Sequence, residues 1–428
     1  MGFAPMTARA LVGLQIAAIV VLGVATVVRL PVWGLVDEAP HYDYVQTLAE
    51  DARLPRLDRD LLHDEVLALD DRTYPGPPAR EATERGLAGR SYEAFQPPLY
   101  YLLATPVFAV AGDHEAKLFA LRGLGLALLL GAVAVAWLLT RRLVPEDPVP
   151  AFGIVLTVFL WPGVVVRAVT VSNAALEMLL GTALSLALWR ALSERSERWL
   201  MGAGAITGAA LLTKLTTIAF LPSLALVCAA FLLERRWRPV AFALAIPALA
   251  IAPWLASNLE RYGSLTANDR AQRLLEPAVN PTGRDFGIDD LPGKHLNLLN
   301  GVLPEEWWLE FLSSTKRWIR NVLVGGLVAI ALVLVAWVPP VQRRYGLAVL
   351  LLPLVAGVLL MTVSLLADNW DVFLPRYLYP ALPGAAALAA LGLVTRASRL
   401  TQLVVAGVTS ALLLVLWLHL STVTPFTR

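Results

Sequence analysis

The sequence predicts an all-α protein, a polytopic membrane bundle of about 11 transmembrane helices with amphipathic juxtamembrane helices in its first outer loop. Hydrophobic residues make up 57% of the chain and charged residues only 16%, whereas an ordinary globular domain carries about a quarter charged residues. The apolar residues also form blocks close to the length of roughly 20 helical residues that crosses a hydrocarbon core. Lipid must therefore cover much of the apolar surface.

The first apolar block, residues 10–28, is interpreted as a retained helix. No small-residue cleavage site follows it, and residues 29–33 have the character of an interfacial anchor. A polar stretch, 34–96, comes next, and a second one, 260–320, separates two of the later blocks. The remaining apolar blocks are 97–112, 118–140, 151–166, 174–189, 199–212, 215–233, 240–259, 322–338, 347–367, 377–394 and 400–420.

The short basic loops decide the topology, because such loops lie on the cytoplasmic side of a membrane. They fall on one side, with the N-terminus inside, only if block 97–112 does not cross. That block is short and opens with Pro97-Pro98, so we expect an interfacial or re-entrant helix. The pair 199–212 and 215–233 is a single re-entrant element in the alternative interpretation, which leaves the later topology unchanged. The basic loops are 141–142, 195–198, 235–238, 343–344 and 396–399.

This topology places the N-terminus in the cytoplasm and both the C-terminus and the two long loops outside it. Residues 1–428 then form a single transmembrane domain, in which 34–96 is the first extracytoplasmic loop and 260–320 the second. Most basic residues are arginine, which suggests a GC-rich bacterial genome and hence a bacterial inner membrane.

Composition also excludes several classes of function. The net charge is +2, and no loop interleaves basic with aromatic residues, so we expect no nucleic acid partner. The lone Cys228 excludes an internal disulfide and a cysteine-based metal site. Membrane lipids are the partners that composition itself predicts.

Two carboxylates stand at the beginning of the first outer loop. Pro40 suits the first turn of a helix, and an apolar stripe follows at Tyr44 and Val45, so we expect an amphipathic helix along the membrane surface. Asp37 and Glu38 precede it, at the depth where a lipid-borne substrate presents its head group. In the alternative interpretation, Asp37 is only an N-cap and Glu38 a favourable charge at the helix dipole.

His41 lies one turn further along the same helix. It is a candidate for proton transfer or metal binding, or alternatively an ordinary interfacial side chain. The rest of the loop, up to Arg90, is rich in proline, glycine and mixed charge, and is interpreted as a partly mobile lid or, alternatively, as a structural connection.

Polar and ionisable groups inside the apolar blocks are costly and normally face the interior of a bundle. Under the topology above, all of them fall toward the outer face, level with Asp37. Singly, each is explained by snorkelling or by a local ion pair, such as Arg167 with Glu177. Jointly they describe a cationic pocket suited to the phosphate of a lipid. The residues are Arg122, Arg167, Asn173, Glu177, Lys214 and Arg376.

The ordered motifs resemble the GT-C superfamily of membrane glycosyltransferases, which includes protein O-mannosyltransferases and aminoarabinose transferases. The motifs are Val36-Asp37-Glu38-Ala39-Pro40-His41, Gln96-Pro97-Pro98-Leu99-Tyr100-Tyr101, Thr170-Val171-Ser172-Asn173-Ala174, Leu211-Leu212-Thr213-Lys214, Asn258-Leu259-Glu260-Arg261-Tyr262 and Pro375-Arg376-Tyr377-Leu378-Tyr379-Pro380.

The resemblance implies inverting transfer of a sugar from a polyprenyl-phosphate donor to a hydroxyl of a glycan, lipid or protein acceptor. Asp37 occupies the place of the family's catalytic acid, and Glu38 matches its second acidic position. Two departures limit the match. Gln96 stands where aminoarabinose transferases have a lysine that contacts the donor phosphate, and the soluble C-terminal domain of some relatives is missing.

Some other cation must then bind the phosphate. The candidates, in order, are Arg376, Lys214, Arg122 and Arg167. Arg376 comes first because polar residues precede it in a short outer loop and Tyr377 adds a hydroxyl donor.

Asn173 is a further candidate for substrate binding. No cofactor is certain, although a divalent metal could bridge Asp37, Glu38 or His41 to phosphate.

Two other functions share these features. A flippase or exporter of a lipid-linked saccharide also needs an outward cationic pocket, but it requires a polar route to the cytoplasmic side, and the inner halves of the helices offer little. A non-catalytic subunit of an envelope-assembly complex would tolerate the loss of Asp37.

Overall fold

The computed structural model describes residues 3–33, 37–73, 89–268, 270, 271, 273, 287–291, 294, 330, 333–368 and 375–423. Several predicted segments lie outside these residues in whole or in part. They are residues 74–88 of the first outer loop, most of the second outer loop, most of block 322–338, and residues 369–374 before the Arg376 motif.

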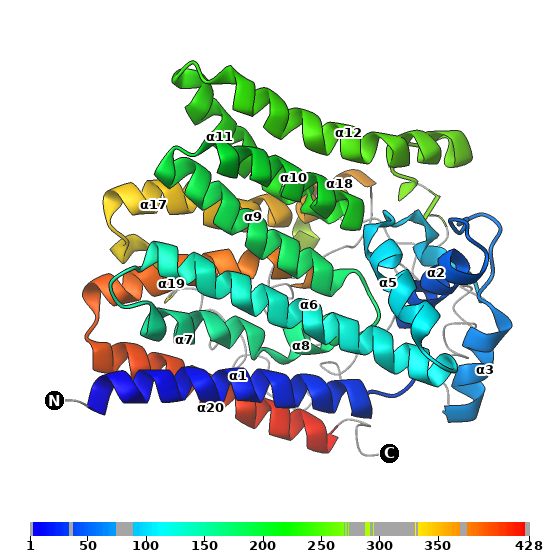
Figure 1. Cartoon of the computed structure of the whole chain (residues 1–428), viewed down its shortest axis with the longest axis horizontal. Helices are drawn as coiled ribbons and strands as arrows, with labels where there is room; N and C mark the ends of the chain where they lie inside the picture. Colours follow the sequence, from blue (N-terminus) through cyan, green and yellow to red (C-terminus); the bar gives the residue numbers. More distant parts are fainter. Residues whose placement is uncertain are drawn as a thin grey trace.

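The described chain is a helical bundle without strands (Figure 1). Its first half contains α1 (Phe3–Arg29), α2 (Glu38–Glu50), α3 (Asp64–Thr73), η2 (Tyr92–Phe95), α5 (Leu99–Val110), α6 (His114–Leu143), α7 (Pro148–Phe159), α8 (Pro162–Val169) and α9 (Ala174–Glu194). Its second half contains α10 (Glu197–Thr213), η3 (Leu215–Phe220), α11 (Leu221–Leu233), α12 (Trp237–Tyr262), η4 (Ile288–Asp290), α17 (Pro340–Gly346), η5 (Leu347–Leu351), α18 (Leu352–Asp368), η6 (Pro375–Ala381), α19 (Leu382–Arg396) and α20 (Arg399–Val423).

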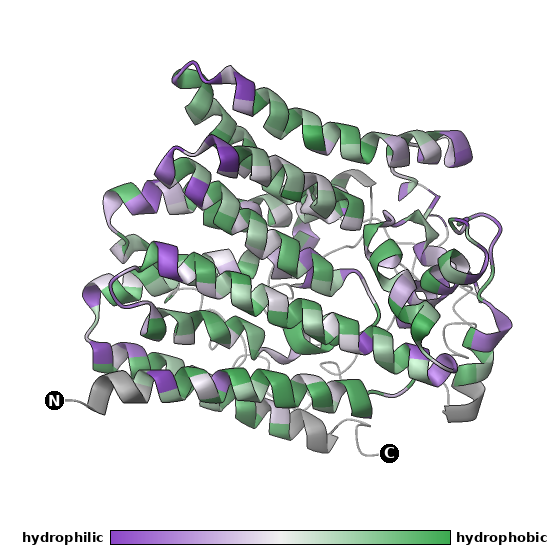
Figure 2. Ribbon diagram, in the orientation of Figure 1, coloured by the Kyte–Doolittle hydropathy of each residue, from purple (hydrophilic) through white to green (hydrophobic). Residues whose placement is uncertain are grey.

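The long helices are apolar along their middles, with polar residues gathered at their ends (Figure 2). Seven helices in the described residues are long and apolar enough to cross a membrane, or eight if α7 and α8 count as one bent span. The protein is therefore a multi-pass membrane protein. The predicted count of about eleven crossings stays a prediction, since α10, α20 and block 322–338 fall outside this set.

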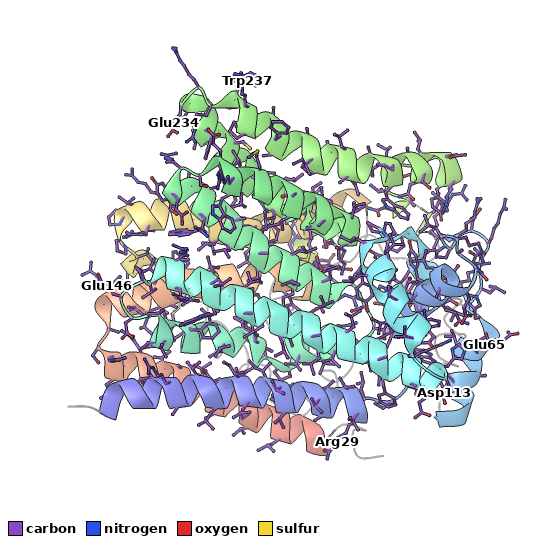
Figure 3. The ribbon with its side chains drawn as sticks, viewed as in Figure 1. Arg29, Glu65, Asp113, Glu146, Glu234 and Trp237 are labelled. Carbon is purple, nitrogen blue, oxygen red and sulfur yellow. The ribbon has the colours of Figure 1, made fainter. Side chains whose placement is uncertain are left out.

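The basic loops gather at one end of the bundle, as the sequence predicted. Arg142 pairs with Glu194 at 3.9 Å, Arg195 with Glu234 at 3.2 Å, and Arg399 with Asp147 at 3.3 Å. Figure 3 places Glu146 and Glu234 at this end, and Arg29, Glu65 and Asp113 at the other. The second end carries α2, α3 and α5.

Block 97–112 does not cross the bundle, and this prediction is confirmed. It forms α5, and both of its flanks contact α2: the Tyr44 hydroxyl donates to the Gln96 carbonyl at 3.2 Å, and Tyr42 lies 2.9 Å from His114 Nδ1. Helix α6 therefore begins at the same end at which α5 begins (Figure 1).

The predicted span 151–166 is divided into two helices, α7 and α8, and its crossing of the membrane stays a prediction. The chain bends by 65° between α7 and α8. Pro162 follows Trp161 at the break, where the ring removes a backbone donor and disfavours helical geometry in the preceding residue. The bend turns α8 so that the loop after it, including Val171, reaches the end of the bundle that carries α2.

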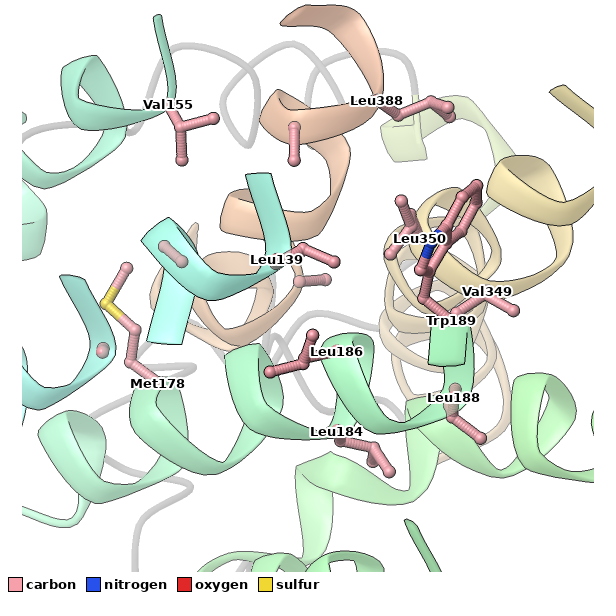
Figure 4. Packing of buried hydrophobic residues seen from close by; sticks show 14 of the residues in the cluster. Leu139, Val155, Met178, Leu184, Leu186, Leu188, Trp189, Val349, Leu350 and Leu388 are labelled. Atoms are coloured by element: carbon pink, nitrogen blue, oxygen red, sulfur yellow. The ribbon is translucent and has the colours of Figure 1, made fainter. Parts of the chain in front are cut away.

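A large hydrophobic core joins α6, α7, α9 and α19 with the α17–α18 segment. Figure 4 shows Leu139, Val155, Leu186, Leu350 and Leu388 converging in it. Helix α10 approaches α12 very closely at Gly204, where any Cβ would collide with the Ala243 backbone. The absence of a side chain at Gly204 allows this approach. Small residues of this kind allow the van der Waals contacts that associate helices in lipid.

The orientation of the bundle can be tested with single cysteines. We expect an impermeant maleimide to label Arg59→Cys, but not Arg142→Cys, on intact spheroplasts when Cys228 is replaced by alanine. Both arginine side chains are more than half exposed, with 69% and 53% of their surface accessible. The reverse labelling pattern would contradict an N-terminus in the cytoplasm. The Cys228→Ala protein without a new cysteine is the control.

Candidate active site

Asp37 sits at the N-cap of α2 with a φ of 78°, a left-handed backbone that a non-glycine residue rarely adopts. Its side chain makes no capping hydrogen bond. Asp113, at the N-cap of α6, has an ordinary φ of −72° and accepts from the Ala116 amide. The alternative in which Asp37 serves only as an N-cap is therefore wrong at the level of the side chain.

The Asp37 carboxylate instead faces two residues from distant parts of the chain. The Tyr92 hydroxyl donates to Oδ1 at 2.9 Å, and Arg376 Nη1 donates to Oδ2 at 2.9 Å. The ion pair is mostly buried, with 20% of the arginine and 11% of the aspartate side chain exposed. Asp37 thus connects α2 with η2 and η6 at the end of the bundle.

Glu38 has a different environment from that of its neighbour. Its two carboxylate oxygens accept from Arg122 Nε at 2.8 Å and Arg122 Nη2 at 2.7 Å, and both side chains are fully buried. The Val171 amide also donates to Glu38 Oε1 at 3.1 Å. The same guanidinium donates to the carbonyls of Leu30 and Pro31, each at 2.7 Å.

The position of Arg122 follows from the packing of α6. Gly125 lies one turn later on α6, where a Cβ would collide with the Ala168 carbonyl oxygen. The glycine therefore lets the end of α8 approach α6 and brings the loop containing Val171 up to Glu38. Through its hydrogen bonds, Arg122 connects α6 to the end of α1 and to the beginning of α2.

Lys214 and Arg376 flank a common aromatic ring. Lys214 Nζ lies 4.8 Å and the Arg376 guanidinium carbon 5.5 Å from the centre of the Tyr377 ring. Lys214 also pairs with Glu177 at 3.4 Å, and the Thr216 hydroxyl donates to Glu177 at 2.7 Å. The partners of Glu177 are thus Lys214 and Thr216, and the suggested ion pair of Glu177 with Arg167 is wrong.

Asn173 and Gln96 extend the same polar network. The Asn173 amide lies 3.4 Å from Gln96 Oε1 and donates to the Thr213 carbonyl at 3.3 Å. Arg167 is buried at the end of α8, close enough to Asp37 to influence its charge. The structure therefore places most of the polar residues that the sequence singled out within the apolar blocks around Asp37, whereas Arg122 pairs with Glu38.

His41 lies beneath this network on α2. Its Nδ1 lies 2.7 Å from the Tyr101 hydroxyl, and its Nε2 lies 4.0 Å from Glu93 Oε2. Burial lowers the pKa of His41. The positive charges of Lys214 and Arg376 act in the same direction and the negative charge of Asp37 opposes them, so that the pKa of His41 is about 3. His41 is therefore neutral at physiological pH, which makes it a hydrogen-bonding group there.

Two carboxyl groups in the site have opposite pKa shifts. Burial by itself would raise the pKa of Asp37, but the guanidinium groups of Arg376 and Arg167 outweigh it and lower the pKa to about 2. Burial raises the pKa of Glu93 to about 8, and the negative charge of Asp37 acts in the same direction. Carboxyl groups with divergent pKa values are typical of sites that handle protons.

Tyr92 and Glu93 lie just after the predicted lid and were not predicted to belong to the site. The described parts of that loop pack against the bundle: Tyr92 and Leu57 share a cluster with Tyr262 from the end of α12. Helix α2, expected along the membrane surface, packs into the protein and is buried on nearly all sides, including Tyr42, Tyr44 and Val45. The available signal was the pair of residues Tyr92-Glu93 shortly before the Pro97-Pro98 motif.

Within the described ranges, no group of three or more His, Cys, Asp or Glu side chains is arranged to hold a metal ion. The hypothesis of a bridging divalent metal stays untested.

Comparison with known proteins agrees with the motifs. Residues 95–256 match the family described as dolichyl-phosphate-mannose-protein mannosyltransferase. Among curated proteins, no sequence matches the chain significantly. Two crystal structures of ArnT from Cupriavidus metallidurans are similar in fold at 15% identity, one bound to undecaprenyl phosphate with a TM-score of 0.51 and one in the apo state with 0.52.

The alignment covers 90% of this chain and 61% of the ArnT chain in the bound form, and 90% and 60% in the apo form. This chain thus spans about three fifths of the length of ArnT. The chain thus shares its fold with these structures, and one segment of it matches the mannosyltransferase family model.

The contacts of Arg122 predict a structural effect on mutation. We expect Arg122→Met to destabilise the protein by about 3–5 kcal/mol, because the substitution leaves the Glu38 carboxylate buried without a cation. The midpoint of thermal unfolding in detergent should fall clearly. The double variant Glu38→Gln, Arg122→Met should recover part of the loss, since no charge is then stranded.

Arg59→Ala, at an exposed position, is the control and should keep the wild-type midpoint. A wild-type midpoint for Arg122→Met would show that the buried pair contributes little.

Proposed function

We propose that this protein is a glycosyltransferase that moves a sugar from a polyprenyl-phosphate donor to an acceptor hydroxyl at the extracytoplasmic face of a bacterial inner membrane. The observation that carries the proposal is the pairing of Asp37 with Arg376. Asp37 has a strained backbone, and its carboxylate meets a guanidinium, a group that binds phosphate well. The pair lies at the end of the bundle, beside Lys214 and Tyr377. Backbone strain of this kind is concentrated at functional sites.

The comparisons support the class of donor. ArnT, whose fold this chain shares, has been crystallised with undecaprenyl phosphate, and the matching family is described by its use of dolichyl-phosphate-mannose. Each of these two ligands is a polyprenyl chain that carries a phosphate, and in the second the phosphate bears a sugar. A bundle with its cationic residues at one end suits such a ligand, because the tail can stay in lipid while the phosphate meets the cations.

In the proposed reaction, the acceptor oxygen forms a bond to the anomeric carbon while the bond from that carbon to the phosphate oxygen breaks. The electron pair leaves with polyprenyl phosphate, and Asp37 takes the acceptor proton. Attack opposite the leaving group gives inversion, as the superfamily resemblance implies. The Tyr92 hydroxyl donates to Asp37 Oδ1 and orients the carboxylate, while Arg376 donates to Oδ2.

Arg376 has two consecutive roles in this mechanism. While it pairs with Asp37, it keeps the pKa of Asp37 near 2, which makes the carboxylate a weak base. A phosphate competes well for a guanidinium, because it accepts charge-assisted, bidentate hydrogen bonds. Donor binding would thus draw Arg376 from Asp37 and raise the basicity of Asp37 when the leaving group is in place.

The other cations take supporting roles. Lys214 is a second candidate for the phosphate, since it faces the same Tyr377 ring. Arg167 contributes positive charge to the site, and Asn173 positions Gln96. Glu38 and Arg122 keep the entrance of α2 in place.

Asp37→Asn tests the catalytic assignment. We expect sugar transfer to fall by a factor of at least about 100, because general-base assistance is worth roughly 10²–10⁴ in rate. The assay incubates purified protein with a panel of polyprenyl-phosphate sugars and measures released polyprenyl phosphate. Asp58→Asn, in an exposed turn of the same loop, is the matched control and should stay active.

Near-wild-type transfer by Asp37→Asn would rule out Asp37 as the base. A scaffold subunit would also tolerate the change, and a flippase would move the lipid without releasing polyprenyl phosphate. Release of polyprenyl phosphate therefore separates a transferase from both of the other functions considered.

Arg376→Ala tests the phosphate assignment. We expect the KM for the polyprenyl-phosphate sugar to rise about tenfold or more, because one charge-assisted hydrogen bond of roughly 1.5–3 kcal/mol is lost. Arg59→Ala is the matched control at the same end of the bundle. An unchanged KM and unchanged binding of the donor would transfer the role to another cation, with Lys214→Ala as the next variant.

A further inference from the structure

Glu93 is a buried carboxyl group that the mechanism above does not use. It lies in η2, next to Tyr92, and only 7% of the residue is exposed. Its Oε2 atom is buried and has no hydrogen-bond partner among the described residues. A buried polar atom without a partner costs about 1–3 kcal/mol, so such atoms in native proteins usually serve a ligand or a water.

The groups facing Glu93 come from several elements. Asp37 and His41 lie at the beginning of α2, and His41 is hydrogen-bonded to Tyr101 on α5. The cations are Lys214, just before η3, and Arg376 in η6. His41 Nε2 lies 4.0 Å from Glu93 Oε2, and the Gln96 side chain hydrogen-bonds the Glu93 carboxyl group. Because His41 is neutral at physiological pH, this contact is not an ion pair.

The other buried acids of the network are matched by cations. Glu38 pairs with Arg122 at 2.7 Å, and Glu177 with Lys214 at 3.4 Å. Glu93 has no comparable cation among the described residues, while the negative charge of Asp37 lies nearby. Burial together with that charge favours the protonated form and raises the pKa of Glu93 to about 8.

We propose that Glu93 acts as a neutral carboxylic acid that hydrogen-bonds a hydroxyl group of the substrate beside Asp37. A protonated carboxyl group donates through O–H and accepts through C=O, and a hydroxyl group does the same, so the two can bond reciprocally. An ammonium group only donates, so it matches a carboxylate instead. The site therefore favours a hydroxylated, uncharged sugar at this position over one bearing a free amine.

This inference rests on the proposed transferase function and deepens it. The hydroxyl belongs either to the sugar of the donor or to the acceptor. The chemistry of recognition is the same in both cases, so the kinetic constant that changes identifies the source.

The pH dependence of transfer tests the proposal with Glu93→Gln. In the wild type, kcat/KM should fall about tenfold per pH unit above pH 8, since ionised Glu93 no longer donates. Glutamine stays neutral and keeps a donor and an acceptor. We expect Glu93→Gln to lower kcat/KM at pH 7 by roughly tenfold through its altered geometry, and to remove the fall above pH 8.

Glu93→Ala removes both hydrogen-bonding functions, and we expect a larger loss at pH 7. A raised KM for the polyprenyl-phosphate sugar assigns the hydroxyl to the donor, and a raised KM for the acceptor assigns it to the acceptor. Glu65→Gln, at an exposed position on α3, is the control and should keep the wild-type pH profile.

The possible outcomes are distinct. An active wild type whose alkaline fall persists in Glu93→Gln overturns the role of Glu93 and leaves the transferase function standing. A wild type that releases no polyprenyl phosphate from any donor in the panel overturns both. If Glu93→Ala does not fold, the comparison of wild type with Glu93→Gln still decides.

Discussion

The buried ion pair of Glu38 with Arg122 fixes the geometry on which the candidate site depends. One guanidinium holds the last carbonyls after α1 and the first carboxylate of α2, and the same carboxylate takes the Val171 amide beyond α8. Four segments are thus joined at one buried point. Because an unpaired charge there would be very costly, the arrangement leaves little freedom to the residues on either side.

Asp37 is one of those residues, and its strained backbone has a direct cause in this arrangement. Between α1 and α2, the carbonyls of Leu30 and Pro31 must accept from Arg122, and α2 must begin only a few residues later. The left-handed φ at Asp37 accommodates this change of chain direction. The turn directs the Asp37 side chain away from the helix end and toward Tyr92 and Arg376. Adjacent acids therefore have separate tasks, one structural and one facing the site.

Charge within the site is divided by the same physics. Every acid here is buried, so desolvation favours protonation of each, and the distribution of cations decides the outcome. Asp37 stays charged because Arg376 and Arg167 are close, whereas Glu93 faces Asp37 and a neutral His41 and takes up a proton. The bundle end thus presents one base and one neutral acid side by side.

The sequence by itself determined the membrane bundle, the shared end of the basic loops and the failure of block 97–112 to cross. These follow from hydropathy and charge counts, which act along the chain and need no knowledge of packing. It also identified Asp37, Arg376 and the polar residues of the apolar blocks as one group, because membrane cost restricts where such residues can lie.

Only the tertiary structure decided which of these residues meet. The pairs Glu38 with Arg122, Glu177 with Lys214 and Asp37 with Arg376 join positions far apart in the chain, and hydropathy carries no information on such partners. The bend before Pro162 and the burial of Glu93 likewise depend on neighbouring helices. Pairing and burial set the charge of each group, so the division of roles between Asp37, Glu38 and Glu93 belongs to the fold.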